Sequence, residues 1–82
     1  MRVIFVCAER WPVIDRYIAS QNNRSSKIEY RGVVEPRKLM AHSHREVVMV
    51  GPWFNAQKLM EFERINEQMF NQVTEADAPA HV

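Results

Sequence analysis

Two short runs of consecutive apolar residues constrain the fold of this chain more than any other feature. Residues 3–6 read Val-Ile-Phe-Val and residues 47–50 read Val-Val-Met-Val. A strand with one face in water alternates apolar and polar residues, whereas a strand of a parallel sheet is covered on both faces and is apolar throughout. We therefore expect residues 2–7 and 47–50 to be central strands of a parallel sheet.

The segment between these two strands carries one helix, one further strand and one short helix. Pro12 suits the first turn of a helix whose apolar face holds Val13, Ile14 and nearby residues, and the polar stretch 20–26 ends it. Residues 28–33 alternate in polarity, as an edge strand does. Pro36 then begins one or two helical turns.

The last third of the chain predicts a longer helix. Gly51 and Pro52 stop the second central strand, and Asn55 is a good N-cap. The helix would bury a stripe that consists of Leu59, Phe62, Ile65, Met69 and Val73. Residues 74–82 have no periodic pattern, so we expect one small α/β domain over residues 1–73 and a disordered tail over residues 74–82.

Strands that alternate with helices indicate a parallel sheet with right-handed crossovers. We expect a minimal three-stranded parallel sheet in the order 2-1-3 with flanking helices. This would be an α/β domain of truncated Rossmann-like or flavodoxin-like type.

Composition bounds the function classes. A net charge of +1 over 82 residues does not provide the field of a dedicated nucleic-acid binder or a polybasic membrane binder. The single cysteine cannot form an internal disulfide, and no apolar stretch is long enough for a membrane span. We expect a cytoplasmic protein that does not bind membranes.

The best-defined location for a ligand is the end of the sheet where the strand order reverses, between the first and third strands. The loops there lead into helix N-termini, which favour anions. The candidate anion-binding residues are Cys7, Glu9, Arg10 and Asn55.

A strand that ends in a cysteine is similar in position to the nucleophile strand of low-molecular-weight tyrosine phosphatases and phosphotransferase IIB proteins. Their loop needs glycines and an arginine six residues after the cysteine, and Val13 stands at that position here. We set that enzyme class aside, assign no catalytic residue, and interpret Cys7 as a core residue. With only two glycines, the chain has no glycine-rich nucleotide loop, and we expect no cofactor.

Two weaker signals occur in the middle of the chain. His42 and His44 are two imidazoles with Glu46 as the only acid close in sequence, and Cys7 could join them only from another loop, so we expect a polar loop and no metal site. The basic residues Arg31, Arg37, Lys38 and Arg45 leave weak nucleic-acid binding as the second alternative.

Large apolar residues in loops and off the helix stripe indicate a binding surface. The candidate partner-binding residues are Trp11, Trp53, Phe54, Met60 and Phe70. Among them we expect Phe54 to lie in the core and at least one tryptophan to be accessible. The sheet would also have two open edges. The leading hypothesis is a non-enzymatic protein-interaction domain or homodimer, and the first alternative is a small anion- or nucleotide-binding or cysteine-dependent enzyme-like domain.

The order of the expected strands and helices resembles that of a known group of proteins, and this resemblance favours the interaction hypothesis. A lone N-terminal strand and helix, residues 32–39 leading to a short helix, and residues 46–53 followed by a last helix resemble small orphan proteins encoded by actinobacterial bacteriophages. The resemblance implies a minimal Rossmann-like domain without agreed catalytic residues. It also implies a bacterial host protein as the partner and the host cytoplasm as the location.

Overall fold

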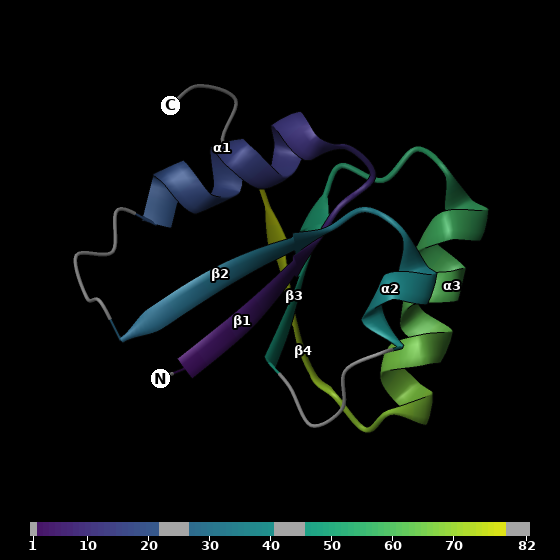
Figure 1. Ribbon diagram of the computed structural model, residues 1–82. Coiled ribbons are helices and arrows are strands. Elements are labelled where there is room, and N and C mark those ends of the chain that lie inside the picture. The colour runs from purple at the N-terminus through teal and green to yellow at the C-terminus, as the bar shows by residue number, and fades with distance from the viewer. Residues whose placement is uncertain (1, 22–26, 41–45, 79–82) are drawn as a thin grey trace.

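The computed structural model describes residues 2–21, 27–40 and 46–78 (Figure 1). In chain order the elements are β1 (Arg2–Cys7), α1 (Trp11–Gln21), β2 (Ile28–Val33), α2 (Pro36–Leu39), β3 (Glu46–Gly51), α3 (Ala56–Gln68) and β4 (Gln72–Asp77). All helices and strands expected before residue 70 are therefore present.

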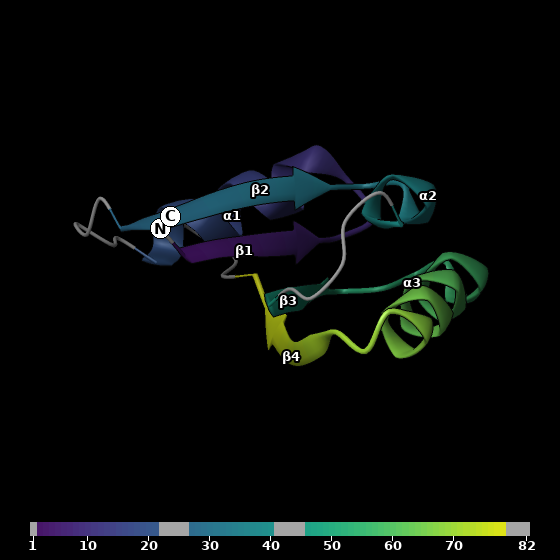
Figure 2. The same cartoon turned by 60° about the horizontal axis from the view of Figure 1, so that its bottom comes forward.

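The strands form one parallel sheet in the order β2-β1-β3-β4. The predicted order 2-1-3 is confirmed within it. Helix α1 packs on one face, and α2 and α3 pack on the other (Figures 1 and 2). The fold is thus an α/β sheet with a helical layer on each side.

The two apolar runs place side chains on both faces. Phe5 and Met49 pack with α2 and α3, whereas Val6 and Val50 pack with α1. Phe62 of α3 is fully buried and meets the Trp53 indole edge to face, with ring centroids 5.7 Å apart. A continuous apolar strand is required here because each face of β1 and β3 meets a helical layer.

The fourth strand corrects the expected three-stranded sheet and the expected start of the tail. Residues 72–77 pair with β3 from Glu46↔Gln72 to Gly51↔Asp77, so residues 74–77 are not disordered. Val73 is not part of the helix stripe but lies in β4 and is 44% exposed. Backbone pairing carries this strand, and its mostly exposed side chains leave no apolar pattern in the sequence.

Helix α3 ends in a tight turn at Phe70. The amide of Phe70 donates to Glu67 O and that of Asn71 donates to Asn66 O at 3.0 Å, which is the hydrogen-bond pattern of a Schellman motif. Phe70 has φ 55°, a conformation that glycine adopts more easily than any side-chain-bearing residue. The turn sends the chain directly into β4.

None of the helices in the described ranges has the length and apolar character needed to cross a bilayer.

Replacing Phe62 with alanine tests the packing of α3. We expect Phe62→Ala to lower the free energy of unfolding by roughly 3–5 kcal/mol, because it removes a fully buried ring and leaves a cavity. Met60→Ala is the matched control on the exposed face of the same helix and should change it by less than about 0.5 kcal/mol. Urea denaturation measures both, and equal effects would contradict the packing described here.

Candidate functional site

The carboxyl ends of β1 and β3 are tied together by Glu9. One carboxylate oxygen of Glu9 accepts hydrogen bonds from the backbone amides of Phe54 and Asn55. The Lys58 ammonium group donates to the backbone oxygen of Glu9 at 3.0 Å. Both the side chain and the backbone of Glu9 therefore connect the loop after β1 to the start of α3.

This arrangement changes the interpretation of the expected anion site. Asn55 caps α3 by accepting a hydrogen bond from the Lys58 amide at 3.1 Å. The Glu9 carboxylate already satisfies amides at the entrance to the helix, where an external anion would have bound. Glu9 and Asn55 do meet, as predicted, but the anion at this helix start belongs to the protein itself.

Cys7 does not join that site. Its side chain is fully buried between β1 and the α2–α3 layer. Burial raises the pKa of the Cys7 thiol to about 12, because the thiolate would lose its solvation. The expectation that Cys7 is a core residue is confirmed by its burial.

Phe54 lies in water, and the expectation that it belongs to the core is wrong. Its side chain is 85% exposed, whereas the preceding Trp53 packs against Phe62. Successive residues of an extended segment point in opposite directions, so only one of the two rings can reach the core. The hydrogen bonds to Glu9 hold the backbone in this arrangement.

A hollow of about 320 Å³ lies beside Phe54 on the α1 side of the sheet end. We call it the Phe54 hollow, and its walls are Glu9, Arg10, Pro12, Val13, Arg16, Pro52 and Phe54. Within the described ranges, neither Arg10 nor Arg16 forms an ion pair, and the buried Nε of Arg16 has no hydrogen-bond partner. The hollow is thus apolar, with two unpaired cations at its wall.

Trp11 is partly covered because Gly32, which has no side chain, leaves room for the ring on β2. A Cβ at Gly32 would lie 2.5 Å from the Trp11 ring and 2.9 Å from Ile14. The ring consequently rests on β2 while 52% of the residue stays exposed. One accessible tryptophan was expected, and Trp11 confirms it.

The remaining candidates lie away from the hollow. Phe70 is 86% exposed just after the C-terminal end of α3. Met60 is 60% exposed and lies within α3. Sequence reasoning placed Pro52 in a loop at this end of the sheet but missed the hollow residues Pro12, Val13 and Arg16. The only signal for Arg16 was its position one helical turn after Pro12, on the same face of α1.

The structure describes only some residues of the alternatives in the middle of the chain. His42, His44 and Arg45 lie outside the described residues. Arg31 forms an ion pair with Glu29, and the described ranges contain no group of three side chains able to hold a metal ion. Arg37 and Lys38 are exposed on the short helix α2.

Removing the Glu9 carboxylate should loosen the sheet end. Glu9→Ala leaves two helix-entrance amides without their acceptor, and we expect the free energy of unfolding to fall by about 1 kcal/mol. Glu9→Gln keeps an oxygen acceptor, so its free energy of unfolding should fall by less than that of Glu9→Ala. Urea denaturation provides the comparison, and an alanine variant as stable as the parent would show that water replaces the carboxylate without loss.

The Cys7 thiol should be inert in the folded protein. Its pKa of about 12 leaves it protonated at pH 7, and still protonated when the pH rises past the ordinary value of 9.0. Labelling with a thiol-reactive disulfide should therefore be far slower in native than in urea-unfolded protein, and raising the pH from 7 to 9 should accelerate mainly the unfolded sample. Native labelling as fast as unfolded labelling would revive the enzyme-like alternative.

Comparison with known proteins gives no relative from which a role could be transferred. No family model, no curated protein and no solved structure matches this chain. What the protein does is therefore inferred from the geometry of its own residues.

Proposed function

We propose that the protein is a non-enzymatic interaction domain that docks onto a partner protein through the Phe54 hollow. The observation that carries this proposal is the Phe54 ring, which is 85% exposed on a backbone held by Glu9. Exposed aromatic rings beside a concave apolar surface are typical of binding hot spots.

The hydrogen-bonded backbone at Phe54 favours binding because it lowers the conformational entropy that is lost when a partner binds. Phe54 follows the end of β3 after Pro52 and Trp53, and its amide is hydrogen-bonded to Glu9 in the loop after β1. A side chain presented on a rigid support loses less conformational entropy when a partner covers it. The half-exposed Trp11 at the start of α1 lies at the same end of the sheet but outside the hollow.

The walls of the hollow indicate the chemistry of the partner. Pro12, Val13 and Pro52 favour an apolar side chain, while Arg10 and Arg16 favour a carboxylate next to it. The partner would accordingly present an apolar residue flanked by Asp or Glu. A bacterial host protein is the partner class that the phage resemblance suggests, and this stays a prediction.

We also propose that the fold is a truncated Rossmann-like or flavodoxin-like domain. The all-parallel order β2-β1-β3-β4 with helices on both faces supports this class. Its customary ligand position, beyond the carboxyl ends of the central strands, is where the Phe54 hollow lies.

A pair of phenylalanine variants tests the docking surface. The tagged protein, Phe54→Ser and Phe70→Ser are used to capture partners from nuclease-treated bacterial lysate. The two rings are equally exposed, at 85% and 86%, so a general loss of apolar surface affects both variants alike. We expect a stoichiometric partner that is retained by the parent and by Phe70→Ser but lost by Phe54→Ser.

The captured protein is then purified, and its affinity is measured with charge variants. Arg16→Glu should weaken binding at least tenfold, because it replaces a cation of the hollow wall with a carboxylate. Thermal melts of each variant confirm folding. Equal capture by both phenylalanine variants, or no stoichiometric partner, would overturn the proposal.

A further inference from the structure

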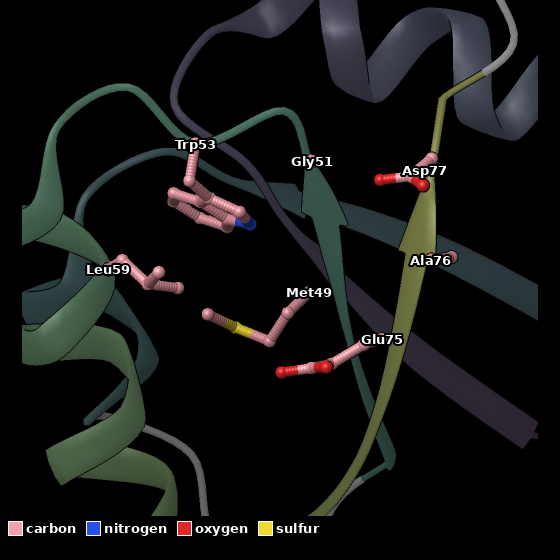
Figure 3. Close-up of a pocket in the computed structure, with 7 residues that line it drawn as sticks. All are labelled: Met49, Gly51, Trp53, Leu59, Glu75, Ala76 and Asp77. Carbon is pink, nitrogen blue, oxygen red and sulfur yellow. The ribbon is translucent and has the colours of Figure 1, made fainter.

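A second concave surface lies on the other face of the sheet, between α3 and β4. It consists of two adjoining cavities of about 260 and 350 Å³ that share Met49 and Glu75. Figure 3 shows the first, in which Trp53 and Leu59 face Glu75 and Asp77 across open space. We call the two cavities together the α3–β4 groove.

The groove has an apolar floor, and the charged residues that line it are all carboxylates. Met49, Trp53, Leu59 and Val73 supply the apolar surface. The charged residues of its walls are Glu63, Glu67, Glu75 and Asp77. None of these carboxylates is paired with a cation within the described ranges, so the groove has an uncompensated negative charge.

The carboxylate of Asp77 is placed over the end of β3 by Gly51. A Cβ at Gly51 would lie 2.9 Å from an Asp77 carboxylate oxygen and 3.6 Å from the Trp53 ring. The missing side chain thus lets a carboxylate and an indole occupy the same corner of the groove. This combination suits a cation with an apolar stem, such as the side chain of arginine or lysine.

The outer edge of β4 is the second part of the surface. β4 is the last strand of the described sheet, and the Ala78 amide donates to Gly51 O on the β3 side. Since backbone groups alternate along a strand, Val73, Glu75 and Asp77 direct their N–H and C=O groups to the open edge. These three residues also line the groove.

We propose that the α3–β4 groove binds an extended basic segment of another protein, which adds as a strand to the edge of β4. Backbone hydrogen bonds to β4 would hold the segment. Every second side chain would lie on the α3 side, with its stem over Met49 and Trp53 and its positive charge near Glu75 and Asp77. Strand addition beside a side-chain groove is an established mode of peptide recognition.

Charge favours such a partner over a second copy of this chain. Two β4 edges paired with each other would bring Glu75 and Asp77 of both copies together, and like charges across a strand pair are destabilising. A segment rich in arginine or lysine has the opposite charge. The carboxylates therefore disfavour self-pairing and select a basic partner.

A peptide of alternating residues tests the proposal. The probe is a fluorescein-labelled nine-residue peptide of alternating arginine and valine, whose arginines share one face in a strand. Its affinity for the intact protein is measured by fluorescence anisotropy at 0.15 M salt. A peptide of alternating glutamate and valine should not bind.

Protein variants separate the groove from net charge. Glu75→Gln with Asp77→Asn should weaken binding of the basic peptide at least tenfold. The matched control, Asp15→Asn with Glu61→Gln, removes two exposed carboxylates outside the groove and should leave affinity within twofold. An equal loss in both pairs would reduce the effect to general electrostatic attraction and overturn the proposal.

Backbone methylation separates strand addition from side-chain binding. One version of the basic peptide is N-methylated at its valines and another at its arginines, so each blocks the amides on a different edge of the strand. We expect one version to lose binding and the other to retain it. Equal binding by both, or no binding of the unmodified peptide, would overturn the proposal.

Discussion

The pairing of β1 with β3 is the constraint on which the rest of the molecule depends. The two strands run in register from Ile4↔Glu46 to Cys7↔Met49, and both faces of the pair are covered by apolar contacts. Within the described ranges three helices supply that cover, and α2 is only four residues long. Helical cover is consequently concentrated on the middle of the sheet, which leaves β4 with a mostly exposed surface.

The same pairing brings together the two loops that carry the exposed aromatic surface. Glu9 and Phe54 are 45 residues apart in sequence but follow adjacent parallel strands, whose carboxyl ends lie at one edge. The Glu9 carboxylate uses this proximity to satisfy the entrance of α3. The end of the sheet where we expected an anion thus presents an exposed ring on a hydrogen-bonded backbone.

Sequence periodicity was sufficient for elements that bury apolar side chains and failed where backbone pairing dominates. Residues 47–50 and the stripe containing Phe62 predict their elements, because burial imposes a pattern on them. β4 has no such pattern, since its side chains are mostly exposed. Phe54 was misplaced because only the contact of Trp53 with Phe62 decides which ring turns inward, and that contact belongs to the tertiary structure.

Near-neutral net charge conceals two surfaces of opposite sign. The Phe54 hollow on the α1 side is lined by Arg10 and Arg16 with one carboxylate, Glu9, whereas the charged residues that line the α3–β4 groove in the described ranges are all carboxylates. A net charge of +1 excludes a uniform field, but it does not describe how the charges are distributed. The two surfaces lie on different sheet faces and, as proposed above, would attract segments of opposite charge. Taken together, the two proposals describe a domain that would connect two segments of different charge through the two faces of one sheet.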